Sequence, residues 1–244
     1  MQGRVMRRWD DTDGLMRLSL LLIMLVQAGP TQPSPDELQL WFTYYYLKPR
    51  PELLLPSLNV VDRDLRREKR GSLAKEVNRG GLRTFYAKVL AQNDQVVGEV
   101  ARRLSSLPRG QQAFITEALR RCGTQACLGA LRTDSRRPSN RDQPATPEDL
   151  DDNWAAFFAT GDERYVRAII ELLPWSEEKD DLMRLATGGA ARWSLASNAY
   201  QHSRVLAICE ESAGTSEGAR RRILDEIVSR AKAQRAKKPP AEPK

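Results

Sequence analysis

The chain contains only one histidine and three cysteines among its 244 residues. With the single histidine, His202, a histidine-rich metal site or a histidine-dependent triad is improbable as the basis of activity. It precedes Cys209 by seven residues, which is about 10 Å along a helix and too far for a catalytic Cys–His pair. We therefore predict no metal, no cofactor and no catalytic residues, and we place His202 in a turn or helix cap.

Other catalytic patterns are weak as well. Adjacent acids such as Asp151 and Asp152 point about 100° apart on a helix, so they do not form a ready acid/base pair. Gly188 and Gly189 resemble an anion-binding helix start, but no phosphate-binding motif and no preceding strand accompany them, and we interpret them as a turn. A meeting of two acids from different parts of the chain remains an alternative.

Three cysteines are too few for a disulfide scaffold, so packing has to hold the fold together. Cys122 and Cys127 are separated by four residues, and a break at Gly123-Thr124 would bring them together in an oxidising compartment. The second interpretation is two buried thiols in adjacent helices. Cys209 lies in an apolar helical pattern and is predicted to belong to the core.

The N-terminus has the features of a secretory signal peptide covering residues 1–28. Arginines precede an uncharged run, Leu18 to Gly29, and cleavage is expected after Ala28. The run has 12 residues, fewer than the roughly 20 that cross a bilayer. We predict a periplasmic or secreted protein with no transmembrane span after cleavage, whichever of Met1, Met6 or Met16 is the start. The alternative is an uncleaved apolar helix.

The net charge of +7 is concentrated in residues 63–83 and in the last 25 residues. In an exported protein such segments face anionic surfaces or acidic partners, and nucleic acid becomes relevant only if the N-terminus is not cleaved. Solvated helix faces are the simpler explanation. We single out Arg63, Arg66 and Arg67 as candidate partner-binding residues.

Apolar residues recur at helical spacing along the chain, and no segment alternates strictly enough to predict a strand. The sequence therefore predicts an all-α fold of stacked antiparallel helical hairpins, similar to an α-solenoid. Its predicted parts are an N-terminal helical array (34–132), a linker rich in Ser, Pro and Arg (133–146), a C-terminal array (147–233) and a disordered basic tail (234–244). Gly80-Gly81 is expected to close the charged connector that precedes it. Helices are expected over 177–186 and from Gly188 onwards, where Trp193 is placed on a close-packed face.

Each array begins with a similar αα-hairpin. Ser34-Pro35 corresponds to Thr146-Pro147, and each pair combines a hydroxyl N-cap with a proline at the first helical position. Trp41 and the two tyrosines that follow correspond to Trp154 and two phenylalanines. The matching aromatic register favours a true internal repeat over two unrelated helix starts. Four aromatics in six residues cannot share one helix face, so Tyr46 is expected to point away from the core towards a partner.

Two segments, WAAFFATGDERYVRAIIELL and LMRLATGGAARWSLASNAYQHSRVL, resemble an uncharacterised class of exported bacterial α-helical proteins. The helix-Gly-Asp-helix hairpin is also distantly similar to tetratricopeptide-like helical repeats, although a regular 34-residue period is absent. The resemblance implies helical hairpins and an interaction function, and it provides no catalytic residues.

These observations favour a non-catalytic helical-repeat protein, exported to the periplasm or cell exterior, that binds a protein or peptide in a groove between hairpins. The alternatives are a carboxylate-dependent hydrolase acting on cell-wall material and, without signal cleavage, a cytoplasmic nucleic-acid-binding protein. Two acids with raised pKa values in one cleft would favour the hydrolase.

Overall fold

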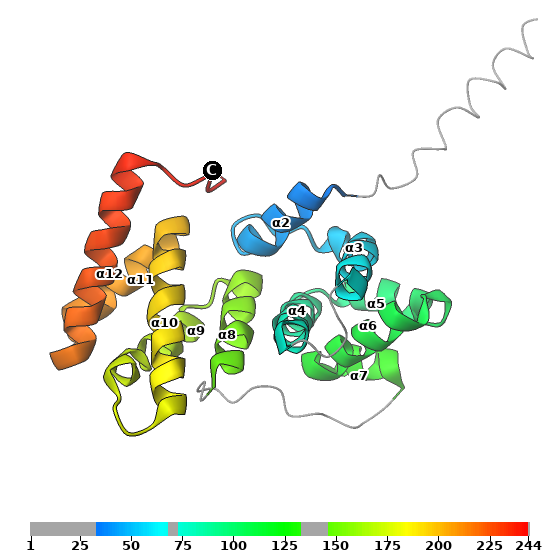
Figure 1. The fold of residues 1–244 in the computed structure, drawn as a ribbon. Helices are drawn as coiled ribbons and strands as arrows, with labels where there is room; N and C mark the ends of the chain where they lie inside the picture. Colours follow the sequence, from blue (N-terminus) through cyan, green and yellow to red (C-terminus); the bar gives the residue numbers. More distant parts are fainter. Residues whose placement is uncertain (1–32, 68–72, 133–145, 244) are drawn as a thin grey trace, which may run out of the picture. The chain divides into compact units, whose positions relative to one another are not determined.

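The computed structural model describes residues 33–67, 73–132 and 146–243, with the backbone alone for 62–67 and 73–79. These ranges contain eleven α-helices, three 3-10 helices and no strand, so the predicted all-α fold is confirmed for them (Figure 1). Among these helices none combines the length and the apolar character that crossing a membrane requires. The predicted signal peptide, residues 1–28, and nearly all of the predicted linker lie outside the described residues.

The described part of the first half contains six α-helices and two 3-10 helices, and the second half begins with α8. The first half consists of α2 (Pro35–Tyr44), η1 (Pro51–Leu53), α3 (Leu54–Arg67), α4 (Leu73–Ala91), α5 (Asp94–Arg103), η2 (Leu104–Ser106), α6 (Arg109–Cys122) and α7 (Gln125–Leu131), and α8 (Pro147–Thr160) follows. α2 begins where predicted, because the Ser34 hydroxyl accepts a hydrogen bond from the Glu37 amide at 3.1 Å. Its inner face buries Leu38, Trp41 and Tyr44.

The second half continues with α9 (Glu163–Ile170), η3 (Leu173–Glu177), α10 (Leu182–Gln201), α11 (Ser203–Thr215) and α12 (Gly218–Lys237). The predicted Gly-Asp hairpin is present: Gly161 ends α8 with φ +69°, and the Asp162 carboxylate accepts the Arg164 amide at the start of α9. α10 packs against η3, α11 and α12, so it is the central helix of this half.

α8 connects two hydrophobic cores. Trp154 and Phe157 belong to the core formed with α9 to α12, whereas Ala155 and Ala159, on the opposite side of the same helix, belong to the core formed with α2 to α7. α8 contacts α4 on one side and α9 and α10 on the other (Figure 1). Residues Ser34–Lys244 form one compact unit.

The two similar helices, α2 and α8, contact each other near their C-terminal ends. Trp41 and Trp154 are both buried, and the Tyr46 amide donates a hydrogen bond to the Phe158 carbonyl at 3.0 Å. The copies differ after this point, because α8 ends at a glycine whereas the segment after α2 contains Pro49 and Pro51. The correspondence therefore extends to caps and aromatic register, and the connections differ.

Three predicted boundaries are wrong. Helices α4 and α10 run through Gly80-Gly81 and Gly188-Gly189, which were expected to end or start helices. One glycine of each pair lies where another backbone comes close: a Cβ on Gly81 would lie 3.4 Å from the Asp151 carbonyl oxygen, and one on Gly188 would collide with the backbone of Trp175 and Ser176. Residues 177–186 do not form one helix, because η3 ends at Glu177 and Asp181 caps a new helix.

The C-terminal segment also differs from the prediction. α12 continues to Lys237, four residues beyond the predicted end at Ala233, and the following residues return to the body of the protein, where Glu242 contacts Ser203. The prediction of a disordered tail over 234–244 is therefore corrected for the described residues up to Pro243.

Candidate functional site

The outer face of α10 carries an exposed apolar stripe. Leu182 is 80% exposed and Trp193 is 74% exposed, and Met183 and Leu185 are exposed as well. Leu182, Leu185, Gly189, Trp193 and Ala196 follow one another at intervals of three or four residues, so they lie along one side of the helix. We call these five residues the α10 stripe.

The middle of the stripe borders a groove between α10 and α12. The groove has a volume of about 560 Å³ and is lined by Gly189, Arg192, Trp193, Ala196, Glu226, Ile227 and Arg230. Glycine and alanine on one wall leave room beside the indole, and Ile227 supplies an apolar floor. An apolar side chain from another molecule would therefore find a shaped recess next to Trp193.

The rim of this groove is charged and mostly basic. Arg192 forms an ion pair with Glu226 at 2.5 Å. Arg230 is exposed and makes no ion pair with any part of the chain that the structure describes. The rim thus carries one unmatched positive charge beside the exposed indole, which favours an acidic group on whatever covers the groove.

The opposite side of α10 fixes the stripe in place. Thr187, Gly188, Ala191, Leu195 and Ala199 are buried and form the inner face of the helix. At its N-terminal end the Arg184 guanidinium lies over the Trp175 ring, 5.2 Å from the centroid, and forms an ion pair with Asp181. Because a packed helix holds the stripe, its side chains are presented on a rigid element.

Trp193 was assigned to a packed face by the sequence analysis, and this was wrong. The helix has two apolar faces, and the small residues at positions 187, 188 and 191 rather than the indole occupy the interior. The spacing of Leu182, Leu185 and Trp193 indicates a second apolar stripe only if one helix runs through all three residues. The break expected at Gly188 placed Trp193 in a different helix from the two leucines.

Tyr46, which was expected to point away from the core, points inward. Its ring lies 5.0 Å from that of Phe157, and its hydroxyl is 3.1 Å from Nδ1 of His202. Burial is the main reason that the pKa of Tyr46 is raised well above its usual value. The geometry thus assigns Tyr46 to packing between α2 and the start of α11.

His202 lies between α10 and α11, in the turn position that was predicted, and its side chain makes no cap hydrogen bond. It is fully buried, and its ring stacks on Phe158 with centroids 5.0 Å apart. Burial lowers the pKa of His202 to about 4, and the positive charge of Arg235 acts in the same direction, against the opposing effect of Glu242. The imidazole is therefore neutral at neutral pH.

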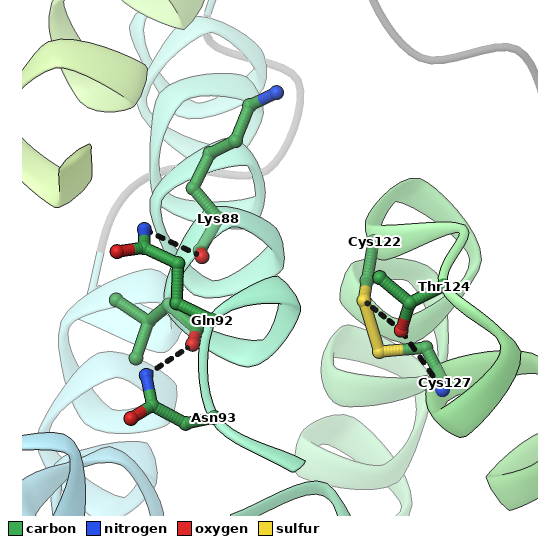
Figure 2. The surroundings of a disulfide bond; sticks show 7 residues. Lys88, Gln92, Asn93, Cys122, Thr124 and Cys127 are labelled. Carbon is green, nitrogen blue, oxygen red and sulfur yellow. Dashed lines mark hydrogen bonds between the residues drawn. A yellow bond between two sulfur atoms is a disulfide. The ribbon is translucent and has the colours of Figure 1, made fainter. Parts of the chain in front are cut away.

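The other predicted site residues are placed as follows. Arg63, Arg66 and Arg67 fall in the second half of α3, and their side chains lie outside the described residues, so their role stays a prediction. Cys122 and Cys127 form a disulfide that joins the end of α6 to α7 across Gly123 (Figure 2). Thr124 caps α7 by accepting the Cys127 amide at 3.3 Å. Cys209 is a buried free thiol, as its apolar surroundings indicated.

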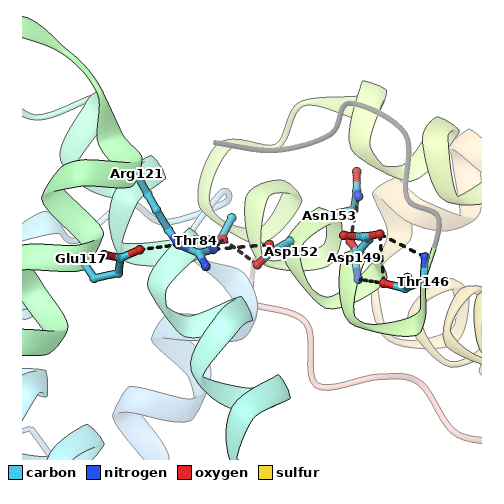
Figure 3. A network of polar contacts seen from close by, with 7 residues as sticks. All are labelled: Thr84, Glu117, Arg121, Thr146, Asp149, Asp152 and Asn153. Atoms are coloured by element: carbon cyan, nitrogen blue, oxygen red, sulfur yellow. Dashed lines mark hydrogen bonds and ion pairs between the residues drawn. The ribbon is translucent and has the colours of Figure 1, made fainter. Parts of the chain in front are cut away.

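The adjacent acids of α8 have different surroundings. Asp152 accepts hydrogen bonds from Thr84 at 2.6 Å and from Arg121 at 3.4 Å (Figure 3). Burial raises the pKa of Asp151, and the charges of Asp152 and Glu148 raise it further. Asp152 therefore joins α8 to α4 and α6. The described residues contain no cluster of three or more metal-ligating side chains.

Comparisons of the chain with models of protein families, with curated proteins and with solved structures find no match. The function is therefore argued from the α10 stripe and its surroundings.

Proposed function

We propose that the chain is a non-catalytic helical protein, exported from the cytoplasm, that binds an amphipathic helix of a partner protein along the α10 stripe. The observation that carries this proposal is the exposure of Trp193 beside an open groove. A tryptophan that is three-quarters exposed presents on the order of 150 Å² of surface, and burying it is worth about 4 kcal/mol. Such a residue is a typical anchor of an interface.

The spacing of the stripe supports a helical partner. Residues 182, 185, 189, 193 and 196 are separated by three, four, four and three residues, close to the pattern by which helices pack side by side in coiled coils. Because Gly189 has no side chain, the backbone or a large side chain of the partner can approach α10 closely at this position. A partner helix with an apolar seam fits this face better than a β-strand, because strand addition needs a sheet edge and the described residues contain no strand.

The charges on the rim support an acidic flank on that partner helix. Arg230 has no carboxylate partner in the described structure, and Arg192 is already paired with Glu226. A glutamate or aspartate beside the partner's apolar seam would pair with Arg230 at the edge of the interface. Such rim contacts set orientation and association rate more than affinity.

Two features support export. The N-terminal sequence has the arrangement of a signal peptide, and a Cys122–Cys127 disulfide persists in an oxidising compartment. We expect a chain that starts at Gly29 in the periplasmic or secreted fraction, detected by N-terminal sequencing after cell fractionation. Recovery of an intact Met1 chain from the cytosol would contradict export without bearing on the α10 stripe.

The binding proposal is tested by comparing three forms of the full chain as baits in the fraction where the protein resides. Trp193→Ala removes the anchor, whereas Leu47→Ala removes an exposed leucine (41% exposed) that lies outside the stripe. We expect the wild type and Leu47→Ala to retain the same protein by quantitative mass spectrometry, and Trp193→Ala to retain at least tenfold less of it. Equal retention by all three forms would refute a role for the stripe.

A further inference from the structure

The C-terminal segment after α12 is bound to the body of the protein through one carboxylate. Glu242 accepts hydrogen bonds from the Ser203 amide at 3.1 Å and from the Ser203 hydroxyl at 2.5 Å. Arg235 lies on the other side, with a guanidinium nitrogen 3.7 Å from the same carboxylate. The side chains of Arg235 and Glu242 are only 19% and 17% exposed, so the contact is largely withdrawn from solvent.

The Glu242 carboxylate occupies an anion-binding site formed by the Ser203 amide, the Ser203 hydroxyl and the Arg235 guanidinium, which we call the receptor. Ser203 is the first residue of α11, and the side chain of the preceding residue supplies no cap, so the free amide at this helix start is available to an acceptor. Arg235 is held in position by hydrogen bonds from its Nε to the Tyr200 carbonyl at 2.8 Å and from its Nη1 to the Ser203 hydroxyl at 2.9 Å. Its Nη2 is buried and makes no hydrogen bond within the described structure, which leaves a donor directed at an anion.

Beside this receptor lies an apolar platform on α2. Ala241 and Pro243 form one wall of a pocket of about 240 Å³ whose other wall contains Leu40, Trp41 and Tyr44. Leu40 is 52% exposed in spite of the segment that covers part of it. Alanine is too small to fill the space next to two aromatic side chains, so the chain's own segment uses the platform incompletely.

Proline-rich segments bind platforms of this kind because prolines keep them extended before binding and reduce the entropy that is lost. The segment that occupies the platform reads Pro239-Pro240-Ala241-Glu242-Pro243. It therefore shows which ligand chemistry the surface accepts: a glutamate flanked by prolines, with an apolar residue just before the glutamate.

We propose that the platform on α2 and the receptor at the start of α11 form a second binding site, for a proline-flanked glutamate segment of another protein, and that residues 239–243 occupy it as an intramolecular competitor. The site is separate from the α10 stripe and does not rest on the function proposed for it. A segment joined to its own site by a short connection has an effective concentration in the millimolar range, so an external peptide binds well only when the chain's own segment is weakened.

The test uses the full chain and a fluorescein-labelled peptide, Lys-Lys-Pro-Pro-Ala-Glu-Pro-Lys, followed by fluorescence anisotropy. Glu242→Ala removes the competing carboxylate. Its matched control, Glu217→Ala, removes an exposed glutamate at the start of α12 that makes no cap hydrogen bond. We expect Glu242→Ala to bind the peptide at least tenfold more tightly than the wild type, and Glu217→Ala to behave like the wild type.

Two further measurements identify the contacts. A peptide with glutamine in place of the glutamate should bind Glu242→Ala at least tenfold more weakly, and one with phenylalanine in place of the alanine should bind more tightly by filling the space at Trp41 and Tyr44. In the Glu242→Ala background, Ser203→Pro removes both Ser203 donors at a helix position that tolerates proline, and His202 already has the extended conformation that precedes proline (φ −118°, ψ 117°). This double variant should lose peptide binding and keep its helical circular dichroism.

The proposal is overturned if Glu242→Ala binds the peptide no better than the wild type, or if the glutamine peptide binds equally well. It is also overturned if the wild type is a dimer by light scattering and Glu242→Ala is a monomer, because the segment would then belong to a second copy of this chain instead of competing with a foreign ligand.

Discussion

Gly188 and Gly189 are adjacent in α10 but have opposite surroundings. A Cβ on Gly188 would lie 2.8 Å from the Cβ of Trp175 and would collide with the backbone of η3, whereas a Cβ on Gly189 would meet nothing within 4 Å. Close contact between α10 and η3 therefore depends on Gly188, whereas Gly189 has no packing role within the chain and weakens the helix.

This contrast predicts effects of opposite sign. Gly188→Ala should lower the free energy of unfolding by about 3 kcal/mol, because a backbone clash cannot be relieved by rotating a side chain. Gly189→Ala should raise it by roughly 0.5–1 kcal/mol, the usual advantage of alanine in a helix. Urea unfolding of both variants measures the difference, and similar values for the two would show that α10 does not approach η3 as described.

His202 gives the protein a specific dependence on pH. Its pKa is lowered to about 4 in the folded chain by burial, while an unfolded histidine titrates near 6.5. Between these values the unfolded chain binds a proton that the folded chain does not, so stability is full above about pH 6.5 and falls as the pH falls towards 4.

Between pH 7 and pH 5 this difference should cost the wild type about 2 kcal/mol of unfolding free energy, over and above the loss caused by other groups. His202→Phe keeps an aromatic ring against Phe158 and removes the titration. Urea unfolding at several pH values should show a steeper loss of stability in the wild type than in His202→Phe. Parallel profiles would mean that the imidazole is accessible to protons in the folded chain.

At the scale of helices, the beginning of α8 shows how two neighbouring charges are used differently. Asp152 is paired with Thr84 of α4 and Arg121 of α6, and Asp151 is partly buried with a raised pKa. The contacts of Asp152 join α8 to the helices of the first half. The buried charge on Asp151, in contrast, lowers the stability of the fold.

The matched variants Asp152→Asn and Asp151→Asn should therefore change stability in opposite directions at pH 7. Asp152→Asn loses the charge in its contact with Arg121 and should destabilise the fold by about 1 kcal/mol, a value reduced because both side chains are about one-quarter exposed. Asp151→Asn removes a carboxylate that folding disfavours above its unfolded pKa, so it should stabilise the fold, and this gain should disappear as the pH falls below about 4. Destabilisation by both variants would contradict this assignment.

The sequence predicted those helices whose ends depend on local chemistry. Ser34, Thr146 and Asp162 cap helices where the pattern indicated, and Gly161 ends α8 through its own positive φ. The predictions at Gly80-Gly81 and Gly188-Gly189 are wrong because Gly81 and Gly188 each admit a distant backbone, which no local pattern reveals. The exposure of Trp193 could not be predicted either, because α10 has two apolar faces and only the packed structure shows which of them is covered.

At the scale of the whole molecule, α8 makes the two halves interdependent. Phe158 packs against both cores, and the Tyr46 amide is hydrogen-bonded to its carbonyl at 3.0 Å. Unfolding either half removes contacts from the other, so the described unit should unfold as one cooperative body.

Two tryptophans allow this to be measured. Trp41 belongs to the core of the first half and Trp154 to the core of the second. Two variants each retain one of these tryptophans and carry phenylalanine at the other tryptophan positions. For each variant, the urea midpoint measured by tryptophan fluorescence should equal the midpoint measured by helical circular dichroism. If the fluorescence midpoint of either variant departed from its circular dichroism midpoint, the halves would be separate folding units.

The claim that most needs testing is that the α10 stripe binds a helix of another protein. The most direct measurement places an aromatic photo-crosslinking amino acid, which keeps a large apolar ring at position 193, in the full chain in living cells, with the same amino acid at position 47 as control. We predict an adduct at position 193 and not at position 47, with a crosslinked peptide that maps to an amphipathic, acidic helix of a second protein. No adduct at position 193 beyond that at position 47, or adducts to lipid alone, would contradict the account.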